Sequence, residues 1–153
     1  MKTKLLSFLI LLSFFGCAEK KAKVSIPKNV ILLISDGTGL SQISSAYFYK
    51  TSEVNYSRFK HIGLITTSSS KEDITDSAAS GTAFSCGEKT YNGAIGVLED
   101  LTPLKNIVEI ASQKGVKTGL VATSSITHAT PASFYAHVTN RDFEEAIAHQ
   151  LSH

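Results

Sequence analysis

Residues 74–87, ITDSAASGTAFSCG, place an aspartate and a serine directly before a run of small residues. The run over residues 78–83 favours a closely packed helix, with Ser77 at a first turn whose backbone N–H groups have no partner within the helix. The partial positive charge of such a helix start attracts anions. Two interpretations are open for Asp76 and Ser77: a nucleophile beside an acid, or ordinary N-capping residues.

The composition of the 153-residue chain is that of one globular domain, with 42% hydrophobic and 18% charged residues. Residues 1–28 hold six lysines and one glutamate, which leaves nine basic and twelve acidic residues in the rest of the chain. The remainder is therefore acidic and has no basic run interleaved with aromatics, so we expect no nucleic-acid partner. The two cysteines, Cys17 and Cys86, do not indicate a disulfide framework.

Residues 1–16 are typical of an export signal, because two lysines precede an apolar run that ends in a glycine. The apolar run is short for a bilayer span, so a retained membrane helix is the weaker alternative. Cys17 follows the glycine directly, and this junction resembles the lipobox of bacterial lipoproteins, although Phe14 departs from the usual aliphatic residue. The resemblance implies a lipidated Cys17 and a polar tether over residues 17–28. The alternative is a free thiol within the signal peptide.

Apolar runs over residues 29–35, 63–67 and 118–123 indicate strands, the first of them buried on both faces of a parallel sheet. A helix that begins at Pro103 and stops at Gly115 precedes the last run. This order of strand, helix and strand predicts an α/β fold, with a doubly wound, mainly parallel sheet and helices on both faces.

Further helices are expected over residues 41–49, from Pro131 onward and near the C-terminus, where Phe143, Ile147 and Leu151 share one face. Three aromatic residues are expected in the core: Tyr47, Phe48 and Phe84.

Polar residues follow the first and last predicted strands. Asp36 stands in ISDGTG, at a carboxyl end where ligands of open α/β sheets bind. A carboxylate there suits a hard cation, and an aspartate that caps a tight turn is the alternative. His128 and Thr130 lie in SSITHAT after the last strand, and Arg141 follows further along the chain.

Taken together, ISDGTG, TDSAAS, KTYNG, HATPA and AHVTNR resemble the motifs of the alkaline phosphatase family over residues 29–150. The resemblance implies hydrolysis of phosphate monoesters through a phosphoserine intermediate, with Zn²⁺ and Mg²⁺ as cofactors. It implies that Ser77 is the nucleophile and a zinc ligand, that Arg141 binds phosphate and that Asp76 orients Arg141. Inorganic phosphate is an implied ligand, and a homodimer is possible for the complete protein.

The same resemblance implies a metal-binding role for three further positions. Asp36 would be shared between a zinc and the magnesium, and Thr130 would bind the magnesium through its hydroxyl. Family members carry either aspartate or histidine at the position of His128, which implies a place beside the magnesium without direct binding. Export and lipidation together would place the protein in the periplasm or at the cell surface, anchored to a bacterial membrane.

Family members are considerably longer than this chain and supply most zinc ligands from their C-terminal part. The candidate ligands after Thr130 have no family spacing: His137, Asp142, His149 and His153. We therefore expect residues 29–153 to be the N-terminal portion of a truncated catalytic domain that is inactive as a phosphatase by itself. Two alternatives stay open: a catalytically inactive surface lipoprotein, and a related metallohydrolase acting on phosphodiesters or sulfate esters.

Two other conspicuous residues are expected to be structural. His137 falls on a predicted short helix, where a packed or solvent-facing histidine is more common than a metal ligand. Cys86 lies among small apolar residues and is expected to be a buried thiol.

Overall fold

The computed structural model of the chain describes residue 26 and residues 28–151. The chain divides into two units, one ending at Ile34 and the other beginning at Ser35, and each is considered by itself. The predicted signal peptide, Cys17 and nearly all of the tether lie outside the described residues. Within the described part, no helix is both long enough and apolar enough to cross a bilayer.

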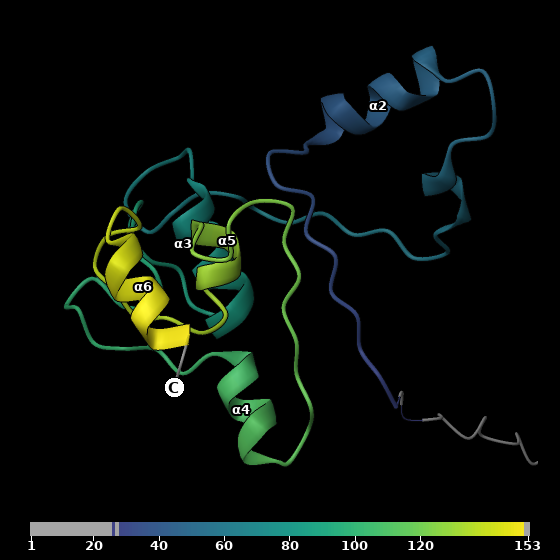
Figure 1. Cartoon of the computed structure of the whole chain (residues 1–153). Coiled ribbons are helices and arrows are strands. Elements are labelled where there is room, and N and C mark those ends of the chain that lie inside the picture. Colours follow the sequence, from purple (N-terminus) through teal and green to yellow (C-terminus); the bar gives the residue numbers. More distant parts are fainter. Residues whose placement is uncertain (1–25, 27, 152–153) are drawn as a thin grey trace, which may run out of the picture. The chain divides into compact units, whose positions relative to one another are not determined.

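The described residues of the second unit form six helical elements, shown in Figure 1. In chain order they are α2 Leu40–Tyr49, η1 Asn55–Arg58, α3 Ser77–Cys86, α4 Ile107–Gln113, α5 Ala129–Ala132 and α6 Glu144–Leu151. Strand-like pairing is limited, over the same residues, to two isolated antiparallel bridges, between Ile95 and Val138 and between Val97 and Pro103.

The segments predicted as strands have no strand partners among the described residues. Their side chains are uncovered: Leu33 is 86% exposed, Leu64 84% and Val121 100%. A strand is stable only where neighbours satisfy its backbone groups and cover its apolar side chains. Residues 29–35, 63–67 and 118–123 are therefore not strands in the described part of the chain, contrary to the prediction.

Helix α3 begins where the sequence predicts, at Ser77. The Asp76 carboxylate caps it by accepting a hydrogen bond from the Ala79 backbone N through Oδ1 at 2.9 Å. Gly87 ends it in the left-handed conformation, with φ of 78°, and donates to Ala83 O. The small residues along the helix bury one side of it against α5, and this contact fixes the position of Ser77 at the helix start.

A small core lies between α3, the Ile95–Val138 bridge, α5 and α6, which gather in Figure 1. Its buried members are mostly alanines, with three larger aliphatic residues: Ala78, Ile95, Ala129, Ala132, Ala136, Val138 and Ile147. Tyr135 packs against them from the side. Alanine-rich contacts let the backbones approach closely, so this core holds the polar residues at the helix ends in fixed positions.

Helix α4 begins four residues later than expected. Asn106, not Pro103, marks its start: Asn106 Oδ1 accepts from Glu109 N at 3.0 Å, and Glu109 Oε2 accepts from Asn106 N at 2.8 Å. This reciprocal capping satisfies two backbone donors. Pro103 instead pairs with Val97, and the neighbouring Leu104 N donates to Gly96 O. The predicted helix start at Pro103 was wrong, because these contacts hold Pro103 and Leu104 outside the helix.

The three aromatic residues expected in the core are at the surface. Tyr47 is 53% exposed, Phe48 83% and Phe84 45%. Helix α2 buries no residue, and α3 buries its small residues while Phe84 stands on the opposite face. The core assignment was therefore wrong, since the available contacts are made by small side chains.

Gly81→Ala is expected to lower the free energy of unfolding by up to about 2 kcal/mol. The added Cβ would lie 2.6 Å from Ser133 Oγ and 3.1 Å from its Cβ. Overpacking of this kind costs about 1–3 kcal/mol, and the better helix propensity of alanine offsets about 1 kcal/mol of it. Urea unfolding measures the difference. In the control Gly119→Ala the Cβ meets nothing within 4 Å, and equal stabilities of the two variants would contradict the close packing.

Candidate active site

The side chains of Asp36, Ser77 and Thr130 meet although they are far apart in the sequence. Ser77 Oγ donates a hydrogen bond to Asp36 Oδ1 at 3.2 Å, and Thr130 Oγ1 donates to Asp36 Oδ2 at 2.8 Å. Ser77 is the first residue of α3, and Thr130 lies in α5. Each carboxylate oxygen thus accepts one hydroxyl. Three residues that the family resemblance assigns to the metal site are brought together here.

Asp36 is carried by a tight turn that follows the first apolar segment. The turn closes through a hydrogen bond from Thr38 N to Ser35 O at 3.2 Å, and Gly37 adopts a φ of 66° within it. That conformation is readily available only to glycine, which explains the residue after Asp36. The turn leaves the Asp36 side chain exposed to solvent, where it accepts the two hydroxyl groups.

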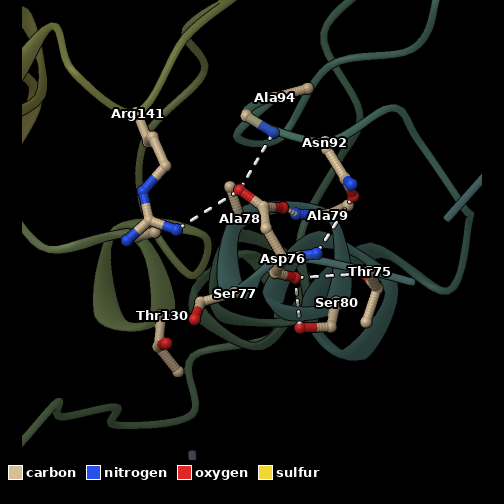
Figure 2. A network of polar contacts seen from close by, with 12 residues as sticks. Thr75, Asp76, Ser77, Ala78, Ala79, Ser80, Asn92, Ala94, Thr130 and Arg141 are labelled. Atoms are coloured by element: carbon tan, nitrogen blue, oxygen red, sulfur yellow. Dashed lines mark hydrogen bonds and ion pairs between the residues drawn. The ribbon is translucent and has the colours of Figure 1, made fainter. Parts of the chain in front are cut away.

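Asp76 and Arg141 form an ion pair next to the start of α3. Arg141 Nη1 lies 3.2 Å from Asp76 Oδ2, and the two side chains are 31% and 27% exposed. Figure 2 shows the Arg141 side chain extending from its loop toward the Asp76 carboxylate. Asp76 therefore has two functions in the structure: Oδ1 caps α3, and Oδ2 holds the arginine beside Ser77.

The loop that carries Arg141 is fixed by pairing with residues 91–95. Ile95 and Val138 exchange two backbone hydrogen bonds, of 3.0 and 2.9 Å. Tyr91 OH donates to Thr139 O at 2.9 Å, and Arg141 N donates to Gly93 O at 2.8 Å. Four contacts over residues 138–141 thus bring the arginine to α3.

His128 occupies the N-cap position of α5 and makes no capping hydrogen bond through its side chain. The residue is exposed, while its backbone N donates to Ser125 O at 3.1 Å. It stands two residues before Thr130, at the same helix start as the predicted magnesium ligand.

The donor atoms around Asp36 are all oxygens, which suits Mg²⁺ better than Zn²⁺. One carboxylate and two hydroxyls would supply only part of a magnesium shell. A tight zinc site wants three or four nitrogen, sulfur or carboxylate ligands. Across residues 28–151, no group of three or more His, Cys, Asp or Glu side chains is arranged to hold a metal ion.

His137 is bound into the structure away from Asp36. Its Nδ1 lies 2.8 Å from Gly96 O and its Nε2 lies 3.3 Å from Glu109 Oε1, while its backbone N donates to Gln150 Oε1. The residue links the central bridge to α4 and α6. Its geometry agrees with the structural role expected for it.

Cys86 is a free, partly buried thiol near the end of α3. Burial raises the pKa of the thiol, Glu109 raises it further, and a hydrogen bond with Ser85 acts in the opposite direction. A raised pKa keeps the sulfur protonated at neutral pH, so Cys86 is a poor nucleophile. Ser77, at the helix start, is the better candidate.

One residue of this site was not singled out from the sequence. Asn92 lies in an Asn-Gly turn, and its Oδ1 accepts a hydrogen bond from the Asp76 backbone N at 3.0 Å. The dipeptide indicates a turn, but the partner of the side chain is 16 residues away. Only the packing of the turn against α3 reveals the contact.

Comparison with known proteins shows the family of this chain. The sequence profile described as alkaline phosphatase matches residues 27–153. Alkaline phosphatase of Schizosaccharomyces pombe is 43% identical over 140 residues, and alkaline phosphatase 3 of Bacillus subtilis is 47% identical over 139 residues. They match 88% and 85% of this chain, which spans only 26% and 30% of their lengths.

A solved structure gives the same result. It is of a variant alkaline phosphatase from the Antarctic bacterium TAB5, with Mg bound in its M3 site. It is 67% identical to this chain with a TM-score of 0.80, and the match covers 82% of this chain and 36% of that one. The chain belongs to the alkaline phosphatase family. This membership confirms the α/β class predicted from the sequence.

Proposed function

We propose that the protein hydrolyses phosphate monoesters through a phosphoserine intermediate on Ser77. The observation that supports this most is the arrangement at one helix start of a serine hydroxyl and an arginine held by Asp76. A phosphate at the start of α3 would meet backbone N–H groups and the guanidinium together. The family is that of phosphate monoester hydrolases, which agrees with such a site.

In the proposed reaction Ser77 Oγ attacks phosphorus, the bond to the ester oxygen breaks and the alcohol leaves. Water then hydrolyses the phosphoserine and releases inorganic phosphate. The Ser77 proton faces Asp36 Oδ1 in the structure, which leaves the oxygen lone pairs available to a substrate. Arg141 would bind two nonbridging phosphate oxygens with its planar fork, and Asp76 would keep the fork oriented.

Metal binding is part of the proposal, and the family is metal-dependent. Asp36 and Thr130 would hold magnesium, with His128 beside it, and Asp36 and Ser77 would contribute to a zinc site. Bound metal ions would neutralise charge on the attacking and leaving oxygens. Of this set, the oxygen donors of Asp36 and Thr130 fit magnesium as they stand.

We also propose that the protein is exported with its signal peptide at residues 1–16 and is lipid-anchored through Cys17. Residues 17–28 would then form the tether, and residues 29–153 would belong to the catalytic domain. Substrates would reach the site outside the cytoplasm, and a homodimer is a further proposal for the complete protein.

Cys17→Ser is expected to remove all fatty-acid label from the protein. The reason is that lipidation of this type needs the thiol as acceptor. Cells grown with a labelled fatty acid and fractionated after lysis provide the measurement. Cys86→Ser is the matched control, since it replaces the other cysteine of the chain and should keep its label. Label that persists in Cys17→Ser would exclude this attachment site.

A further inference from the structure

The Asn92 side chain forms hydrogen bonds with the segment that leads into α3. Its Oδ1 accepts a hydrogen bond from Asp76 N at 3.0 Å, and its Nδ2 donates to Ile74 O at 2.9 Å and to a carboxylate oxygen of Glu72. A backbone N–H only donates and a backbone carbonyl only accepts, so these partners settle the orientation of the amide. Both ends of the Asn92 amide are thus bonded to residues 72–76.

Gly93 connects the same turn to the arginine. Its backbone N donates to Asp76 Oδ2 at 3.0 Å, and its carbonyl accepts from Arg141 N at 2.8 Å. Asp76 Oδ2 also accepts from Arg141 Nη1, so one carboxylate oxygen is shared by the turn and the guanidinium. Figure 2 shows this network around the Asp76 carboxylate, with Asn92 on one side and Arg141 on the other.

Gly93 has a φ of 90°, which non-glycine residues rarely adopt. The turn therefore has a specific conformation that depends on glycine. In that conformation the Gly93 N–H donates to the Asp76 carboxylate, while the Gly93 carbonyl accepts a hydrogen bond from Arg141 N. A change in the turn would move the start of α3 and the arginine relative to each other.

We propose that the Asn92–Gly93 turn is a positioning element for phosphate binding: it fixes Asp76 and the backbone of Arg141 in one arrangement, so that the guanidinium is aligned with Ser77. The inference rests on the proposed function and adds Asn92 and Gly93 to it. Asn92 bonds to residues 72–76, and in this proposal it acts on a phosphate through Asp76 and Arg141.

The test is a double-mutant cycle on inhibition by inorganic phosphate, with protein expressed from its native gene. The four forms are the unsubstituted protein, Asn92→Ala, Arg141→Ala and the double variant. We expect Asn92→Ala to weaken phosphate inhibition about tenfold when Arg141 is present. This is the size expected if the misaligned guanidinium loses one hydrogen bond to the charged phosphate. With Arg141 already replaced, the further effect should be below about twofold.

The matched control is Asn55→Ala, which removes an exposed asparagine of η1 and should leave phosphate inhibition unchanged. Equal weakening by Asn92→Ala with and without Arg141 would overturn the proposal, because general loosening of the fold acts independently of the arginine. If Arg141→Ala alone leaves phosphate inhibition unchanged, the phosphate-binding role of Arg141 in the proposed function fails. The two failures are therefore distinguishable.

Gly93→Ala keeps the proposal testable if Asn92→Ala does not fold. A Cβ at this position meets nothing within 4 Å, so the substitution strains the backbone of the turn without a clash. The same cycle with Arg141→Ala should show the same coupling. Independent effects of Gly93→Ala and Arg141→Ala would contradict a positioning role for the turn.

Discussion

Ser77→Ala is expected to lower phosphatase turnover on the order of 10⁴-fold or more, because it removes the atom that attacks phosphorus. The hydroxyl lies at the first residue of α3 and donates to Asp36 Oδ1, and it is the nucleophile of the proposed reaction. Alanine is well tolerated in a helix, and the fold should survive the change. Steady-state kinetics with a chromogenic phosphate monoester at alkaline pH measures the loss.

Ser80→Ala is the matched control for this experiment. Ser80 lies one turn further along the same helix, and its Oγ donates to the Asp76 backbone carbonyl at 2.8 Å. The control removes a serine hydroxyl from the same helix and leaves the hydrogen bond between Ser77 and Asp36 in place. Equal losses of activity in the two variants would mean that Ser77 acts through helix stability and is not the nucleophile.

Arg141→Lys is expected to weaken phosphate and transition-state binding by about 1–3 kcal/mol, or roughly 5- to 150-fold in kcat/KM. A lysine supplies a point charge where the guanidinium supplies a planar fork, and it cannot bind Asp76 and a phosphate in the same geometry. Inhibition by inorganic phosphate should weaken in parallel with kcat/KM. Both quantities come from one set of inhibition assays.

Arg58→Lys provides the comparison, since Arg58 is the other arginine of the chain and lies exposed in η1. It should leave both kinetic quantities unchanged. If inorganic phosphate inhibits the Arg141→Lys form as well as the unsubstituted protein, Arg141 does not hold the phosphate. The ion pair with Asp76 would then be structural only.

Local signals explain what could be predicted from the sequence. The capping aspartate and the small residues predict α3 within one stretch, and the structure confirms its start at Ser77. The family motifs named Asp36, Ser77 and Thr130 as neighbours and paired Asp76 with Arg141, and the structure brings both groups together. Their roles in catalysis remain predictions.

Non-local contacts explain what could not be predicted. Pairing of residues 29–35 in a sheet depends on partner strands that no local pattern supplies, and the segment is uncovered among the described residues. The start of α4 lies after Pro103 because Pro103 pairs with Val97 across a turn, and this contact is not visible in the local sequence. The Asn92-Gly93 dipeptide is typical of a turn, but the bonds of Asn92 to the segment before α3 depend on how the turn packs.

The covalent intermediate tests the central claim most directly. The protein is incubated at acid pH with a substrate labelled in its phosphoryl group, quenched and digested, and the labelled peptide is sequenced. We predict that the label lies on Ser77, within residues 74–87, and that Ser77→Ala carries none. Label on any other residue, or a labelled Ser77→Ala protein, would contradict the account.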